Sequence, residues 1–181
     1  ETAHDVAVTS DGRVYVVGQF GSIQLALGDS NFERAGGTDG FVAALDPAGA
    51  VLWGRQLGAD GNDNAQTITS IPGSLLFIGG DFENRVDWGN GFESTSLGNL
   101  DGYAVGLDTA AGETRHLFHW QDAETVVVND IAFSPVCADD SSTCSTLRFN
   151  VAGRVSSVFP EVPEIMAIPP TFRSIWSLPL P

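Results

Sequence analysis

The sequence predicts an all-β fold made of β-propeller-type blades, each a four-stranded antiparallel meander. Short runs rich in β-branched and aromatic residues alternate with turns that contain Gly, Pro and Asp, and no helical periodicity competes with them. The segment 39–45 returns 62 positions later as the segment 101–107, and Gly18 recurs at that same spacing as Gly80. Two separate landmarks in one register indicate a duplicated supersecondary unit.

The first predicted unit covers residues 1–63 and contains four strand-like runs. They are residues 5–9, 13–18, 40–45 and 51–57. A Ser-Asp-Gly turn at 10–12 joins the first two runs, since glycine supplies the positive φ of a tight turn. An Asp-Pro-Ala-Gly turn at 46–49 joins the last two, with Pro and Gly where turns favour them.

The second predicted unit covers residues 64–128 and repeats this pattern. Its runs are residues 67–70, 75–78, 103–107 and 114–119. Matching Thr69-Ser70 with Thr9-Ser10 gives an offset of 60 for the first run, so we expect the turn at 71–73 to begin restoring the later offset.

The third predicted unit, residues 129–181, is degenerate and ends in a Pro-rich segment. Residues 130–134 match 5–9, and residues 148–153 match the strand that ends at Gly18. Beyond Gly153 no glycine follows, six of the nine prolines lie after Phe159, and the Asp-Gly-aromatic landmark is missing. Residues 164–168 and 172–178 are candidates for its outer strands. The consecutive prolines 169 and 170 restrict such strands to an edge or a loop.

A single four-stranded sheet exposes two apolar faces, and stacking such blades buries each face on the next. A closed propeller typically has about four to eight blades. Since this chain supplies at most three, we expect part of a larger or oligomeric assembly, or an arc whose end faces are covered in another way. A sandwich of about 12 strands is the alternative architecture.

These motifs resemble the bacterial seven-bladed β-propeller repeat family, over about two thirds of the chain. The matching segments are 12–20, 36–49, 52–53, 80–82, 86–89 and 101–108. The resemblance implies propeller blades and a secreted or cell-surface setting, but no particular reaction. Its landmark positions have structural roles. They are Gly18, Asp39, Phe41, Leu45, Gly80, Asp101, Tyr103 and Leu107.

The charge of the chain excludes two classes of partner. Eight basic residues, all arginine, face 23 acidic residues and give a formal net charge of −15 at pH 7. Such a chain repels nucleic acid and anionic lipid, and no apolar run is long enough for membrane insertion. No secretory signal pattern opens the chain. We therefore expect a processed or recombinant piece of a longer polypeptide that was exported to the extracellular space or the cell surface.

The two cysteines, Cys137 and Cys144, enclose a polar six-residue turn between strand-like residues. With no further cysteine, this spacing does not match a zinc or redox motif. It predicts a disulfide that closes a hairpin, stabilises the fold by roughly 2.5 kcal/mol and indicates an oxidising compartment. Two free thiols are the alternative.

Candidate chemistry is sparse, and we predict no catalytic residues and no organic cofactor. Asp60, Asn62 and Asn64 have the alternate spacing of oxygen ligands in calcium loops, without the glycine and distal glutamate of an EF-hand. A polar turn between blades is the favoured interpretation, and a Ca²⁺ site is the alternative. His116 and His119 fall on opposite faces of a strand, so they cannot share a metal unless a bulge intervenes.

Three functions agree with these features. The favoured one is a non-catalytic module whose blade-face loops bind a protein or a glycan. Trp88 and Trp120 lie near loops and offer an aromatic platform for sugars, although packing in the core or rim is favoured. The second is a structural subunit that self-associates into a ring or fibre. The third is a propeller hydrolase or lyase, for which the candidates on the innermost strands, Asp5, Gln66 and Asp130, are sparse.

Overall fold

The computed structural model describes residues 1–71, 75–123, 125–137, 144–155 and 171–179, without the side chains of 135–137, 144–148, 155 and 171–179. These residues form fifteen strands with connecting turns and contain no helix, which confirms the all-β prediction. Accordingly, the described part of the chain has no helix able to cross a membrane.

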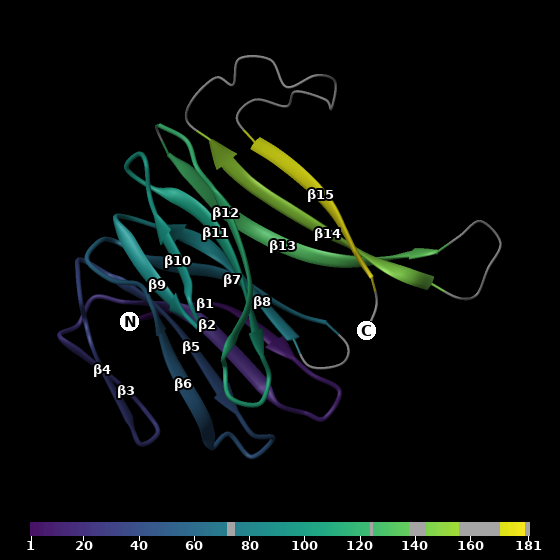
Figure 1. Ribbon diagram of the computed structural model, residues 1–181. Helices are drawn as coiled ribbons and strands as arrows, with labels where there is room; N and C mark the ends of the chain where they lie inside the picture. The colour runs from purple at the N-terminus through teal and green to yellow at the C-terminus, as the bar shows by residue number, and fades with distance from the viewer. Residues whose placement is uncertain (72–74, 124, 138–143, 156–170, 180–181) are drawn as a thin grey trace.

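Three antiparallel sheets follow one another along the chain, and we call them blades 1, 2 and 3 (Figure 1). Blade 1 has the order β1 (Thr2–Val8), β2 (Val14–Phe20), β5 (Asp39–Leu45), β6 (Val51–Leu57). Blade 2 has the order β7 (Asn64–Ile71), β8 (Leu75–Phe82), β11 (Asp101–Asp108), β12 (Thr114–Trp120). The described part of blade 3 has the order β13 (Val126–Cys137), β14 (Cys144–Val155), β15 (Thr171–Pro179).

A small hairpin interrupts each of the first two blades between its second and third strands. The hairpins are β3 (Gln24–Leu27) with β4 (Ser30–Glu33), and β9 (Arg85–Gly89) with β10 (Phe92–Thr95). Leu25 of the first hairpin packs with Phe20 and Phe41 of blade 1. Val86 and Trp88 of the second hairpin lie in the core between blades 1 and 2.

The register of the two complete blades is the same at an offset of 62 residues. Gly18 lies opposite Phe41 in blade 1, and Gly80 lies opposite Tyr103 in blade 2. The same offset holds in the first strands, because Val6 pairs with Val16 and Ile68 pairs with Ile78. The expected offset of 60 in this strand is therefore wrong. The offset of 60 comes from the identical Thr-Ser pairs at the ends of the two strands. The hydrogen-bonded pairing of the strands has an offset of 62 instead.

Each innermost strand carries a bulge at the same place. One residue is skipped between Ala3 and Asp5 in β1, between Ala65 and Thr67 in β7, and between Val128 and Asp130 in β13. The skipped residues are His4, Gln66 and Asn129. The shared bulge identifies the first hairpin of blade 3 as a third copy of the repeat.

Blade 3 also keeps the position of the third strand. Phe172 of β15 lies opposite Gly153, as Phe41 lies opposite Gly18 and Tyr103 opposite Gly80. The aromatic position of the landmark is thus present, although the Asp-Gly before it is absent from the sequence. Residues 164–168, the other candidate outer strand, lie outside the described residues. Strand β13 starts at Val126, slightly before the boundary predicted at 128/129.

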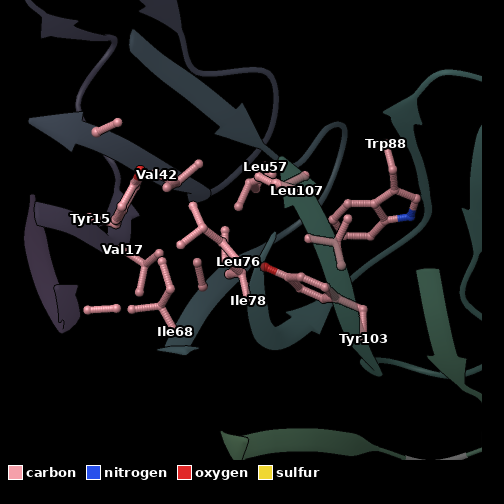
Figure 2. Packing of buried hydrophobic residues seen from close by; sticks show 14 of the residues in the cluster. Tyr15, Val17, Val42, Leu57, Ile68, Leu76, Ile78, Trp88, Tyr103 and Leu107 are labelled. Carbon is pink, nitrogen blue, oxygen red and sulfur yellow. The ribbon is translucent and has the colours of Figure 1, made fainter. Parts of the chain in front are cut away.

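The blades pack face to face through apolar side chains. Tyr15 and Val17 of blade 1 meet Leu76 and Ile78 of blade 2 in one buried cluster (Figure 2), and all four side chains have an exposed fraction of 0%. Full burial of such a side chain stabilises the fold by roughly 1.5–3 kcal/mol. A second cluster joins Phe77 of blade 2 to Ile131, Phe149 and Val151 of blade 3.

The three sheets form a stack with two end faces, and the described residues do not close it into a ring (Figure 1). This arrangement also differs from a two-sheet sandwich, the alternative architecture. The backbone of Cys137 pairs with that of Cys144 where the β13–β14 hairpin narrows. Their side chains and residues 138–143 lie outside the described part of the chain, so the disulfide stays a prediction.

Gly18 and Gly80 sit where the neighbouring backbone leaves no room for a side chain. A Cβ on Gly80 would lie 1.8 Å from the carbonyl oxygen of Asn64, and one on Gly18 would lie 2.0 Å from that of Thr2. We expect Gly80→Ala to lower the free energy of unfolding by roughly 3 kcal/mol or more, because the bulged strand must move away. Chemical denaturation of the purified chain measures this loss.

The matched control is Gly21→Ala, where a Cβ meets only Thr38 Cγ2 at an ordinary 3.6 Å. It should change the free energy of unfolding by less than about 0.5 kcal/mol. Equal effects of the two substitutions would contradict the close approach.

Candidate functional site

Polar groups gather at one end of the blades, where the second strands end and the third strands begin. We call this region the loop rim and define it as residues 21–23, 34–39, 58–64, 83–84 and 96–101. Two fully buried aspartates, Asp39 and Asp101, occupy equivalent places in it. Asp39 Oδ2 accepts a hydrogen bond from the Ala35 amide at 2.7 Å, and Asp101 Oδ2 accepts one from the Leu97 amide at 3.0 Å. Each aspartate thus holds the loop before its own strand.

The same two carboxylates also bind the last strand of their blade. Gln56 Nε2 of β6 donates to Asp39 Oδ2 at 2.8 Å, and His119 Nε2 of β12 lies 3.1 Å from Asp101 Oδ2. Phe41 and Tyr103, which follow in the landmark, are buried. In each of the first two blades, the aspartate of the Asp-Gly-aromatic landmark therefore joins the rim loop to the last strand.

Asp63 connects blade 1 to blade 2. Its carboxylate accepts hydrogen bonds from the Ala59 amide at 2.6 Å and from the Glu83 amide at 3.0 Å. Glu83 in turn accepts two hydrogen bonds from Asn62, from the backbone amide and from Nδ2, both at 2.9 Å. The loop that leaves blade 1 is therefore fixed to the end of β8.

Burial changes the acidity of this region. It raises the pKa of Asp63 to about 6, and the nearby carboxylates of Asp39 and Glu83 add to this effect. Burial, with the charges of Asp63 and Glu83, raises the pKa of Asp81 to about 7, although the Arg154 cation of blade 3 opposes the shift. Asp63 of the loop rim and Asp81 of β8 are therefore two carboxyl groups that gain protons near neutral pH.

The three candidate calcium ligands have different hydrogen-bond surroundings, and the Ca²⁺ site stays a prediction. Asp60 is exposed and its carbonyl accepts a hydrogen bond from Asn84 Nδ2 at 3.2 Å, while the Asn62 side chain binds Glu83. The Asn64 carbonyl accepts a hydrogen bond from the Tyr103 hydroxyl at 3.1 Å. Within the described residues, no group of three or more acidic, histidine or cysteine side chains is arranged to hold a metal ion.

The innermost strands bring together three residues that occupy the same place in the repeat. Thr67 Oγ1 lies 3.1 Å from Asp5 Oδ2 and 3.4 Å from Asp130 Oδ1. The Ile68 amide also donates to Asp5 Oδ2 at 2.9 Å. Since a hydroxyl has one hydrogen, Thr67 donates to one carboxylate at a time. The structure thus uses two of the three innermost candidates, Asp5 and Asp130, to join the blades at their first strands.

The histidines have separate environments. His116 stacks on Phe77 with ring centroids 6.0 Å apart, while the His119 ring contacts Phe82 at 5.0 Å. Phe77 packs toward blade 3 and Phe82 toward blade 1, so the two imidazoles lie on opposite faces of β12 and cannot bind one metal ion. His4 Nδ1 lies 3.0 Å from the Ala65 carbonyl oxygen.

The described tryptophans pack into the fold. Trp88 has an exposed fraction of 1% and contacts the Tyr103 ring at 4.4 Å, so an exposed platform that includes Trp88 is wrong. Trp120 is half-buried and stacks on Phe118 with ring centroids 6.3 Å apart. The Trp176 side chain lies outside the described residues.

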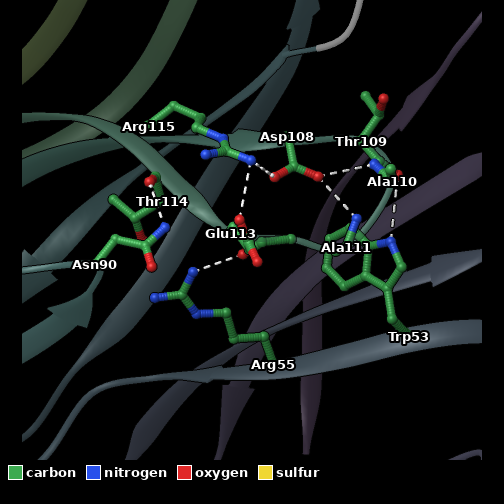
Figure 3. A network of polar contacts seen from close by, with 11 residues as sticks. Trp53, Arg55, Asn90, Asp108, Thr109, Ala110, Ala111, Glu113, Thr114 and Arg115 are labelled. Atoms are coloured by element: carbon green, nitrogen blue, oxygen red, sulfur yellow. Dashed lines mark hydrogen bonds and ion pairs between the residues drawn. The ribbon is translucent and has the colours of Figure 1, made fainter.

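A polar clamp at the outer edge joins blade 1 to blade 2 (Figure 3). Trp53 Nε1 donates to the Thr109 carbonyl at 3.3 Å, and Arg55 Nη1 donates to the Gly112 carbonyl at 2.6 Å. Arg55 Nη2 also donates to the Trp88 carbonyl. Burial lowers the pKa of Arg55, and the nearby Asp87 carboxylate opposes this shift. Sequence reasoning missed this clamp, because its partners are backbone carbonyls far along the chain.

Comparison with known proteins does not assign the chain to a family. No protein-family model matches the chain, and no curated protein matches it. The function is therefore inferred from the loop rim, the polar clamp and the faces of the blades.

The raised pKa values predict that the fold is more stable in mild acid than at neutral pH. Between about pH 4 and pH 7 the folded chain holds protons that the unfolded chain, with Asp pKa values near 3.8, has released. The free energy of unfolding therefore falls as the pH rises through this window. We expect Asp81→Asn, which stays neutral, to raise it at pH 7.5 by roughly 1–3 kcal/mol and to weaken its pH dependence.

Denaturant unfolding at pH 5.0 and pH 7.5 measures both effects. The matched control is Asp29→Asn on an exposed turn, which should leave the pH dependence unchanged. A wild-type chain that is more stable at pH 7.5 than at pH 5.0 would rule out this account of the rim.

Proposed function

We propose that the protein is a non-catalytic interaction module of the extracellular space or cell surface, whose loop rim binds a protein partner. The observation that carries this proposal is the exposure of Ile23 and Leu97. Their exposed fractions are 78% and 70%, and both lie on rim loops of neighbouring blades. Large exposed apolar side chains on loops at one end of a fold are typical anchors of a protein interface.

The loops that present these side chains are held in place before any partner arrives. The Ile23 carbonyl accepts a hydrogen bond from the Arg34 amide at 3.0 Å. The Leu97 amide donates to buried Asp101 at 3.0 Å. Fixed loops lose less conformational entropy on binding, which favours affinity.

The chemistry of the chain favours a protein over the alternative partner, a glycan. Sugar binding commonly uses exposed tryptophan faces, and here Trp88 is buried and Trp120 is half-buried. The net charge of −15 favours a partner with a basic surface around its apolar pockets. Exposure to an oxidising compartment agrees with the predicted disulfide between Cys137 and Cys144.

The double substitution Ile23→Ser/Leu97→Ser tests this proposal. We expect it to weaken binding to the partner at least tenfold, which corresponds to about 1.4 kcal/mol, while the exposed positions leave the fold intact. The immobilised chain is first used to capture surface and secreted proteins of the native host. Titration of the captured protein then compares the variant with the wild type.

The matched control is Ala48→Ser, on the exposed β5–β6 turn at the opposite end of blade 1, which should bind as the wild type does. A glycan array run in parallel addresses the other partner class. Saturable glycan binding that survives the rim substitutions, or equal protein binding by both variants, would refute the proposal.

A second candidate, a structural subunit that assembles through its blade faces, is favoured by one observation. Val6 and Val8 of blade 1 have exposed fractions of 55% and 60% on an end face of the stack. Self-association of the chain at this face would support the candidate.

A further inference from the structure

We propose that the open face of blade 1 is a docking site for one further blade of this repeat type. The open face comprises Val6, Val8, Val14 and Val16 of β1 and β2, on the side turned away from blade 2. This proposal does not depend on the loop rim, which lies at the ends of the strands.

The same positions are covered in the other two blades. Val6 corresponds to Ile68 in blade 2 and to Ile131 in blade 3 through the shared bulge. The exposed fraction is 55% for Val6 but 5% for Ile68 and 3% for Ile131. Ile68 is covered by blade 1 and Ile131 by blade 2. Blade 1 therefore presents an uncovered copy of a face that the rest of the molecule buries.

The internal interface defines what the occupant must offer. Blade 1 covers blade 2 with Tyr15, Val17 and Val42, all with an exposed fraction of 0%. At the outer edge, Arg55 donates to the carbonyl of Trp88 on the inserted hairpin β9–β10. The open face already carries the corresponding hairpin, β3–β4, packed on its outer half. A matching occupant is thus a four-stranded blade with an aromatic residue, valines and an arginine at these positions.

At the opposite end of the stack, the described residues of blade 3 include a polar side chain at an equivalent position. Asn150 of blade 3 occupies the place of Tyr15 in blade 1 and Phe77 in blade 2. Its Nδ2 lies 3.2 Å from Ser134 Oγ and 3.4 Å from the Ala132 carbonyl oxygen, on the face turned away from blade 2. A second copy of this chain docked end to end would place the Asn150 side chain against the valines of the open face, which favours a further blade over a second copy as the occupant.

The test adds a blade to the complete chain. Residues 1–62 are duplicated in front of Glu1, so the 62-residue period continues and the added blade meets the open face as blade 1 meets blade 2. Val8→Cys in the original blade 1 then reports whether this face is covered, through its rate of thiol labelling resolved by mass spectrometry. We expect labelling at position 8 to slow at least tenfold in the extended chain. Ile23→Cys on the rim should be labelled equally fast in both chains.

Three substitutions make the result specific. Val6→Asp in the original blade 1 of the extended chain should restore fast labelling, yet it should leave the denaturation midpoint of the unextended chain unchanged. Ile68→Asp, at the equivalent covered position, should unfold the unextended chain. Replacing the added copy's Tyr15 with Ser should also restore fast labelling.

Other outcomes overturn the proposal. The added blade has the sequence of blade 1, which already folds with its outer face open, so fast labelling in the extended chain means that the face does not accept a blade. Sedimentation of the unextended chain as a dimer that Val6→Asp dissociates would make a second copy the occupant instead. Sedimentation of the unextended chain as a fibre would likewise make further copies of this chain the occupant. Loss of rim binding in the Ile23→Ser/Leu97→Ser variant would leave each of these readouts unaffected.

Discussion

The constraint on which this fold depends is that a blade is one layer thick. The faces through which the blades pack on one another are apolar, and covering these faces stabilises the fold. Blade 2 satisfies this constraint completely, since Ile78 packs toward blade 1 and Phe77 packs toward blade 3. The order of the sheets, the shared register and the location of the exposed valines all follow from how each blade finds its neighbour.

Polar contacts then fix how neighbouring blades are aligned, because apolar faces alone allow sliding. Asp63 accepts a hydrogen bond from the amide that follows β8, and Arg55 donates one to a backbone carbonyl of blade 2 at the outer edge. Thr67 joins the innermost strands through a hydrogen bond to Asp5. These three contacts lie at the rim, the outer edge and the inner edge of the blade 1–blade 2 interface. Several of them use backbone carbonyls or amides as partners, so they depend on the backbone path more than on side-chain identity.

The sequence predicts the repeat well where residue identity and backbone geometry coincide. Gly80 and Asp101 are recognisable because a glycine and an aspartate are required there, by close approach and by loop capping respectively. The first strand was misaligned because Thr-Ser letters matched out of register, while the bulge that sets the register has no fixed residue type. The strand that starts near Phe172 is among the predicted candidates, but its equivalence to the strands of Phe41 and Tyr103 is not predicted, because the Asp-Gly that marks this position elsewhere is absent. The raised pKa values of Asp63 and Asp81 and the exposure of Val6 depend on how the blades bury or leave open these positions, which one strand pattern does not reveal.

The shared bulge has a consequence for how such repeats diversify. In each innermost strand the skipped residue is left out of the ladder, and the three copies have histidine, glutamine and asparagine there. The skipped residue has no partner in the strand pairing, so its side chain can differ between copies. The residue before it stays paired with a glycine in each copy. The variable side chains of the skipped residues therefore lie along the inner edge of the stack. The positions next to them are held nearly constant by packing. Duplication of this repeat would supply new inner-edge chemistries while the scaffold stayed the same.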